Sequence, residues 1–343
     1  MRVTGMKQRP LGLFDQDVRY RKLESLGDPL VTLNRIVPWS IFREPLEAAR
    51  GTPRDPRKGG RPAYDAILMF KILVLREMYA LSDEQVEYQV ADRLSFQRFL
   101  GIGIEHPVPD YSAVWRFREK LKGGVIEELF ENLGAYIDVA GFEAKKGQML
   151  DASLVEKPRT RKPAQPREGE ANLTPMQAAH RDADADWTKK HGRSYFGYKN
   201  HVNADVEHGF IRAFATSTAS VHDPQRSEAL LDITREGEPV YADSAYRSAA
   251  MTRRCENFDL KDRTMHKAQC NRPLTARQQA SNKARAKIRA RVEHVFARID
   301  QFRHGKRLRC TGLGRAHVCI GLINIVHNLR RLLTKWPNEP ATA

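Results

Sequence analysis

Apolar residues along the chain mark a helical first part and a mixed second part. From 64 to 79 they recur so densely that a buried helix is predicted. Ser82 is a good helix-capping residue, and the acidic residues that follow it favour the start of a second helix there. Three further helices are predicted, from Ser95, from Asp110 and over 125–139.

The first sixty residues show no such period. They mix aromatic and charged side chains and end in the glycine- and proline-rich stretch Gly51–Pro62, which is typical of neither helix nor sheet. We therefore expect an N-terminal arm and basic linker over 1–60, a helical domain over 61–140 and a second domain over 144–335. Residues 336–343 are expected to form a tail.

The helix predicted from Tyr111 is the candidate DNA reader of the helical domain. It carries Trp115, Arg116 and further basic residues, as the DNA-contacting helix of a helix-turn-helix unit does. The alternative is that Trp115 and Phe117 are core residues and that the basic side chains form a solvated face. The domain is expected to bind DNA or to mediate dimerisation.

The second domain has the pattern of an α/β fold. Gly147–Val155 is predicted to be a buried strand, and residues of about 156–190 lack apolar periodicity, which indicates an exposed insertion. A hairpin is predicted over 193–203 and 209–216, followed by a helix through 228–233 and a strand that ends at Asp243. A long helix over 288–302 closes the domain. Such mixed sheets gather their sites at strand ends.

Three acidic residues stand out within these elements. Asp151 interrupts the first buried strand, Asp243 ends the later one, and Glu293 lies on the last helix. An ionised carboxylate in a buried strand must be paired or must bind a metal ion. Three carboxylates predict a site for hard ions such as Mg²⁺, and two ions about 4 Å apart promote phosphoryl transfer. The alternative is that Asp151 is a turn residue, Asp243 a helix cap and Glu293 the partner of Arg289.

The last predicted helix separates its charges by face. At about 100° per residue, its apolar side chains share one arc, and Arg289 and Glu293 lie together at one edge of that arc. Arg291 and Arg298 lie beyond the opposite edge, where phosphates are expected. On the predicted sheet, Lys199 and His201 lie on the same face of one strand. Both are candidates for DNA contact, and the alternative for His201 is a structural role. Arg247 follows Asp243 closely enough to hold a phosphate.

Charge supports a nucleic-acid partner. The net charge is +16 and the isoelectric point is near 9.8, which favours a polyanion. From Met251 onward the chain has 21 Lys and Arg against 6 Asp and Glu, so most of the excess lies in the last quarter. We expect double-stranded DNA to face that region.

Cysteine spacing and hydropathy indicate the compartment. The four cysteines show no Cys-x-x-Cys pair and no zinc-like spacing with histidine, so neither disulfides nor structural zinc are expected. No run approaches the roughly 20 apolar residues of a membrane span, and the N-terminus lacks the apolar segment of a signal peptide. A cytoplasmic protein is expected.

Seven short stretches, in order along the chain, resemble bacterial DDE transposases of the insertion-sequence-five type. They are Gly60–Asp65, Leu81–Glu87, Leu94–Gly101, Leu150–Ser153, Tyr195–His201, Tyr241–Arg247 and Val292–Phe296. The resemblance implies an RNase H-like catalytic core in which Asp151, Asp243 and Glu293 correspond to the acidic triad. It also implies two Mg²⁺ or Mn²⁺ ions, cleavage at the terminal inverted repeats of a mobile element and strand transfer to target DNA.

The resemblance has one departure and leaves two alternatives. Related elements often have tyrosine seven positions before the glutamate, arginine four before and lysine seven after; here those positions are Ala286, Arg289 and Asp300. Arg298 or Arg303 are the candidates to replace the missing contacts. Because transposition brings two ends together, a homodimer or higher assembly on DNA is expected. The alternatives are a non-catalytic DNA-binding regulator and a general RNase H-like nuclease.

Overall fold

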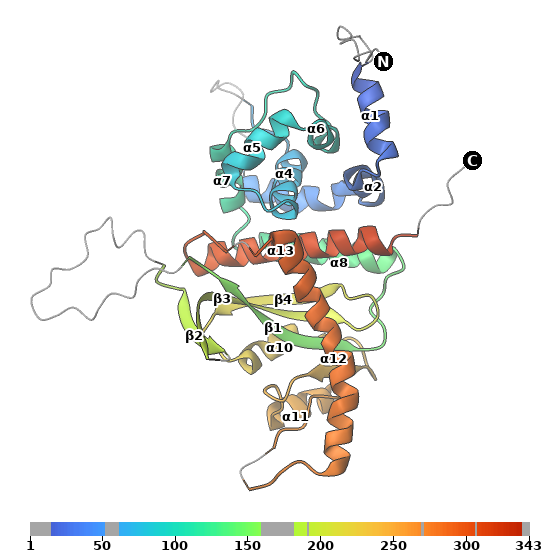
Figure 1. The fold of residues 1–343 in the computed structure, drawn as a ribbon, viewed down its shortest axis with the longest axis vertical. Helices are drawn as coiled ribbons and strands as arrows, with labels where there is room; N and C mark the ends of the chain where they lie inside the picture. Colours follow the sequence, from blue (N-terminus) through green and yellow to red (C-terminus); the bar gives the residue numbers. More distant parts are fainter. Residues whose placement is uncertain are drawn as a thin grey trace, which may run out of the picture.

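A layer of helices stands on a mixed sheet in the computed structural model of the chain (Figure 1). The structure describes residues 15–51, 62–158, 182–190, 192–268, 271–305 and 307–337. Helices also cover both faces of the sheet, so the predicted α/β class with a helical N-terminal region is confirmed.

The N-terminal layer consists of short helices. They are α1 (Asp15–Ser25), α2 (Pro29–Ile36), the 3₁₀ turn η1 (Trp39–Phe42), α3 (Arg43–Arg50), α4 (Ala66–Met78), α5 (Asp83–Asp92), α6 (Leu94–Leu100) and α7 (Tyr111–Glu119). Two predicted starts have the expected caps: Ser82 accepts from the amide of Gln85, and Asp110 accepts from that of Ala113. These caps satisfy amides that the first helical turn leaves without partners.

Residues 15–50 differ from the expected irregular arm. They form three α-helices and a 3₁₀ turn, and Leu30, Leu33, Phe42 and Leu46 are fully buried in the core. The helices are only 8 to 11 residues long, so their apolar positions are too few to establish a period in the sequence. Tertiary packing stabilises them, because isolated helices of this length are marginal in water.

The sheet has its central strand at β1. Its strands are β1 (Gln148–Glu156), β2 (Asp186–Lys190), β3 (Arg193–Asp205), β4 (Ile211–Thr218), β5 (Pro239–Ala242) and β6 (Lys261–Asp262). β1 pairs antiparallel with β3 and parallel with β5, and β5 pairs parallel with β6. Both β2 and β4 pair antiparallel with β3, at different parts of its length.

Alternation along β1 assigns the two faces of the sheet. Met149 belongs to the large core that contains Val292 and Val295, whereas Leu150 belongs to a second core with Tyr246 and Met251. The remaining elements are α8 (Val125–Val139), η3 (Asp223–Arg226), α10 (Ser227–Leu230), α11 (Ala249–Asn257), α12 (Ala276–Arg303) and α13 (Leu313–Lys335). Thus α12 and α13 cover one face, and α10 and α11 contribute to the other. Successive side chains of a strand point to opposite faces, so Asp151 faces α12 with Met149.

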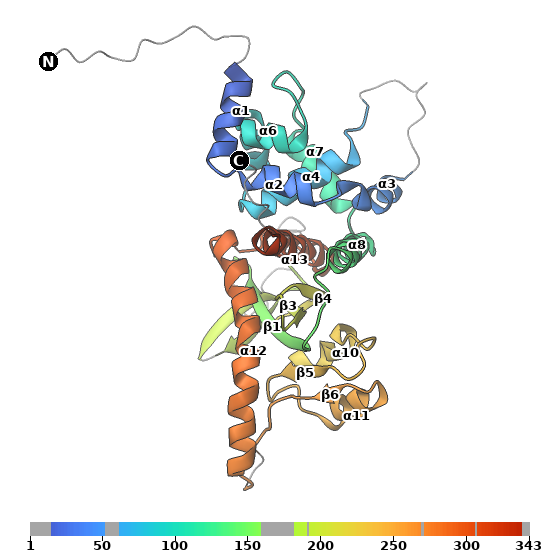
Figure 2. The ribbon, with the colours of Figure 1, turned by 90° about the vertical axis from the view of Figure 1, so that its right-hand side faces the viewer.

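α8 and α13 lie side by side between the N-terminal helices and the sheet (Figure 2). One continuous core therefore runs from Leu30 to Leu332. α8, expected in the helical domain, contacts β4 through the Phe130–Phe214 ring pair. The packing does not break where the sequence suggests a domain boundary.

Four elements of the second domain, β2, α11, β6 and α13, have no counterpart among the predicted ones. α13 is buried on nearly every side, including its polar residues Asn324, His327 and Asn328, so it shows no polar face from which a period is read. β2 lies within the expected insertion, where Asp186–Lys190 pair with β3. Residues 159–181 of that insertion lie outside the described residues.

Two buried histidines predict a loss of stability in mild acid. Burial lowers the pKa of His201 and of His327 to about 4, from a normal value of 6.5. Between these values the unfolded chain binds protons that the folded chain does not, so stability is full above about pH 6.5 and falls as the pH drops toward 4. At about pH 5 each histidine is expected to cost about 2 kcal/mol.

Urea unfolding at about pH 7.5 and about pH 5 measures this loss. His327→Gln is the informative variant, because its amide can replace the hydrogen bond of His327 Nε2 to the Gly209 carbonyl. Its stability should fall less between the two pH values than that of the wild type. Equal losses in both proteins would contradict the assignment to His327.

Candidate active site

Asp151 and Asp243 come together at the parallel pair β1–β5. The last paired residues are Leu150 and Ala242; Asp151 is the next residue of β1, and Asp243 is the residue that follows the end of β5. Neighbouring strands lie about 4.8 Å apart. Leu150 and Ala242 both face the second core, so the side chains one position further along point toward α12. Two predicted acids, 92 positions apart in the sequence, therefore lie side by side.

Glu293 reaches this pair through Arg289. Arg289 on α12 donates to the Asp151 carboxylate (Nη1 to Oδ2, 3.2 Å) and to Glu293 (Nη2 to Oε1, 2.8 Å). Glu293 is four residues after Arg289, on the same helix face, and its side chain is 60% exposed. The predicted association of Arg289 with Glu293 is present, and Arg289 also holds Asp151.

The electrostatics of Asp151 reflect a site that disfavours its negative charge. Burial raises the pKa of Asp151 to about 6, and the neighbouring Asp243 carboxylate adds to the rise. The amide of Ala152 and the Arg289 guanidinium act in the opposite direction. Arg289 does not compensate fully, and its own buried Nε has no hydrogen-bond partner among the described residues. A buried carboxylate with a perturbed pKa is typical of functional sites.

The acids fit a divalent cation only in part. Among the described residues, no three His, Cys, Asp or Glu side chains are placed to share a metal ion. Asp151 and Asp243 have the adjacency and the oxygen ligands that Mg²⁺ prefers. Glu293 is joined to Asp151 by the guanidinium between them. Arg289 therefore stands between Asp151 and Glu293, and the convergence of all three carboxylates on metal ions stays a prediction.

The predicted DNA-contacting residues of α7 are exposed. Trp115 is 43% exposed and Arg116 is also on the surface, whereas Phe117 is buried. The alternative of a core role thus describes Phe117 and not Trp115. Arg118, next on the helix, is buried and pairs with Asp83, so it has a structural role.

Arg291 and Arg298 lie on a different face of α12 from Glu293. Arg291 donates to the Val206 carbonyl at 3.0 Å, and both Arg298 and Arg331 approach the turn glycine Gly209. Arg291 and Arg298 are both exposed. They form a basic surface around the β3–β4 turn, with Arg331 of α13 as a member that the sequence did not indicate.

Lys199 and His201 do not face DNA. His201 is 0% exposed and shares a hydrogen bond of 2.7 Å with the Ser217 hydroxyl. Lys199 donates to the Val221 carbonyl and pairs with Asp223 at 2.8 Å. The expectation of DNA contact from this strand is corrected: β3 is an inner strand, and His201 is engaged by β4 and Lys199 by the segment that follows β4. The structural alternative for the histidine holds.

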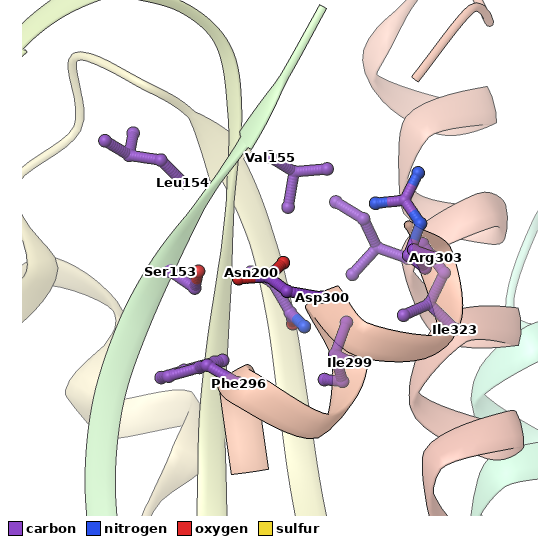
Figure 3. A pocket seen from close by; sticks show the side chains of 10 residues that line it. Ser153, Leu154, Val155, Asn200, Phe296, Ile299, Asp300, Arg303 and Ile323 are labelled. Carbon is purple, nitrogen blue, oxygen red and sulfur yellow. The ribbon is translucent and has the colours of Figure 1, made fainter. Parts of the chain in front are cut away.

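The cavity in Figure 3 lies further along β1 and is distinct from the acids. Ser153 and Asn200 from the sheet face Ile299, Asp300 and Arg303 of α12. The cavity volume is about 20 Å³, which is room for one or two water molecules. It does not accommodate a nucleotide.

Comparison with known families assigns most of the chain. Residues 18–120 match the family described as Transposase domain (DUF772), and residues 144–329 match that described as Transposase DDE domain. Because the second match spans more than half of the chain, the chain belongs to the transposase DDE domain family, whose activity is DNA cleavage and transfer. The acidic side chains of β1, β5 and α12 all lie inside that match.

The chain is similar at a low level to one solved structure. The piggyBac transposase, determined by cryo-EM as a synaptic complex with hairpin DNA, is 11% identical to the chain. The match covers 92% of this chain and 76% of that one, with a TM-score of 0.46.

No helix within the described residues is long and apolar enough to span a membrane.

Proposed function

We propose that this chain is the transposase of a bacterial insertion sequence of the insertion-sequence-five type. It binds the terminal inverted repeats of its element, cleaves DNA there and joins the freed strand to a target. Asp151, Asp243 and Glu293 are the catalytic acids and hold Mg²⁺ or Mn²⁺ ions. The protein acts in the cytoplasm as a homodimer or higher assembly on DNA.

The observation that carries the proposal is the pair of aspartates at β1 and β5. Two carboxylates on adjacent parallel strands cost free energy unless a cation neutralises them. The rise in the pKa of Asp151 to about 6 is consistent with that cost. The strand order β4-β3-β1-β5-β6, with β3 opposite in direction to the others, supports an RNase H-like core.

The acids and Arg289 would have different roles in the site. Asp151 and Asp243 would hold the ions from the sheet, and Glu293 would complete the set once Arg289 leaves the space between the carboxylates. Bound ions lower the pKa of an attacking water and stabilise charge on the leaving oxygen. Arg289, when released, remains close enough to pair with a DNA phosphate.

The basic surfaces supply affinity for the DNA backbone. Arg291, Arg298 and Arg247 would contact phosphates of the catalytic region, and Trp115 and Arg116 would contact DNA from α7. Each phosphate neutralised makes binding weaker as salt rises. The exposure of Trp115, Arg116, Arg247, Arg291 and Arg298 favours this role.

Cleavage of the element's own ends tests the proposal. A duplex that carries the inverted repeat flanking the gene should be cut by the purified protein at the repeat terminus, in the presence of Mg²⁺ or Mn²⁺. A duplex with a scrambled repeat is the control. Equal cutting of both duplexes would indicate a general nuclease, and binding of the repeat without cutting in either metal would indicate a regulator.

A further inference from the structure

Two arginines from distant segments donate to one carbonyl oxygen. Arg247 Nη1 lies 3.1 Å from the Thr264 carbonyl, and Arg285 Nη1 lies 2.6 Å from the same atom. Thr264 is fully buried. Two like charges thus meet at a fixed point of the backbone, and this shared acceptor sets the position of both guanidiniums.

This pair lies next to the acids. Arg247 follows Asp243 by four residues, and the Met265 amide beyond Thr264 donates to the Ala242 carbonyl at the end of β5. Arg285 lies one helical turn before Arg289 on α12, so Arg285, Arg289 and Glu293 share one helix face. Along that face Arg285, which donates to the Thr264 carbonyl, comes first, then Arg289, which holds Asp151 and Glu293, and then Glu293 itself.

Neither arginine has an acidic partner among the described residues. Asp262 acts on the charge of Arg285 without an ion pair, and its oxygens accept hydrogen bonds from Thr264 and Thr252. Burial lowers the pKa of Arg285, and repulsion from Arg263 and Arg247 lowers it further. Each guanidinium has five N–H groups and uses one here. An anion bound at the pair would relieve the repulsion between the two guanidiniums.

We propose that Arg247 and Arg285 form a phosphate clamp for the phosphodiester next to the one that is cut. Guanidinium groups bind phosphate through paired N–H donors, which fixes both distance and orientation. The inference rests on the proposed function, because it uses the acids to locate the cut. It assigns Arg285 a role that neither its sequence context nor the family match indicates.

The clamp is a positioning device. A phosphate held at Arg247 and Arg285 places its neighbour, one nucleotide along the strand, over Asp151 and Asp243. Contacts to phosphate set the register of a protein on DNA without reading its sequence. The clamp should therefore matter for any sequence at the cut, and its loss should misplace the strand as well as weaken binding.

Single neutral phosphates test the clamp directly. Repeat duplexes in which one phosphate at a time, on either side of the cut, is replaced by a methylphosphonate are bound to the wild type and to Arg285→Gln, with Ca²⁺ in place of the reactive metal. At one position the wild type should lose affinity by roughly tenfold. Arg285→Gln should bind the unmodified duplex about as weakly and should show no additional loss at that position. Its dependence on log salt should fall by about one.

Two controls separate the possible failures. Arg253→Gln removes the same charge from the exposed surface of α11 and should retain the wild-type profile. Mn²⁺ binding to Arg285→Gln without DNA should be unchanged, because Arg285 does not contact the acids. If each methylphosphonate weakens Arg285→Gln as much as it weakens the wild type, at every position, the clamp is wrong and the proposed function is untouched. Failure of the wild type to cut the unmodified repeat would refute the proposed function and leave the phosphate map as evidence on binding alone.

Discussion

Asp151→Asn is expected to reduce DNA cleavage by roughly a thousandfold or more. Metal ions contribute several kcal/mol to phosphoryl transfer, and each 1.4 kcal/mol is about a factor of ten in rate. The amide has nearly the same shape, but it removes the charge that holds the ion. Single-turnover cleavage of the repeat duplex at saturating protein measures the effect, because it separates the chemical step from binding.

The same variant should fold and bind DNA normally. Burial disfavours the charge of Asp151, so the amide costs little stability, and affinity for the duplex should not fall. Asp300→Asn is the matched control: Asp300 also lies on the sheet side of α12, and burial raises its pKa, yet it lines the small cavity away from the acids. If Asp151→Asn cleaves as fast as Asp300→Asn, Asp151 is not a catalytic residue.

Local signals located the acids well. The strand around Asp151 and the strand before Asp243 lie within two residues of their predicted bounds, and α8 has the bounds 125–139 that its amphipathic pattern predicted. Adjacency of β1 and β5 was not readable from the sequence, because it depends on which strands pair. The angular argument placed Arg289 and Glu293 on one face of α12 correctly, since helical geometry is a local property.

The features that the sequence failed to predict have a common physical cause. His201 shares its strand face with the charged Lys199, which is typical of an exposed face, but β4 and the segment after it engage these side chains, so burial there is a property of the sheet. Arg285 is one of many arginines in its segment, and only the position of Thr264 distinguishes it. Its spacing of four from Arg289 was the one available signal. Helix α13 shows the same limit, because a helix buried on all sides has no polar face.

Arg289→Gln is expected to strengthen metal binding in the absence of DNA by about fivefold. The guanidinium holds Asp151 and Glu293, so a divalent ion must compete with it for the same oxygens. An ion pair of this partly exposed kind is worth about 1 kcal/mol, which is about a factor of five in affinity. Mn²⁺ titration followed by electron paramagnetic resonance measures the free ion directly and does not depend on cleavage.

Two variants distinguish an Arg289 that competes with the metal ion from an Arg289 that holds the acids in place for it. Arg289→Lys keeps the positive charge, but a single ammonium lacks the planar fork that reaches both carboxylates, so its Mn²⁺ affinity should lie between those of the wild type and Arg289→Gln. With DNA present the order of activity should reverse, because the released Arg289 would then be lost as a phosphate partner. Weaker Mn²⁺ binding by Arg289→Gln would show instead that the arginine holds the two acids in place for the ion. In that case Arg289 is part of the framework of the site, and the two aspartates alone set its affinity.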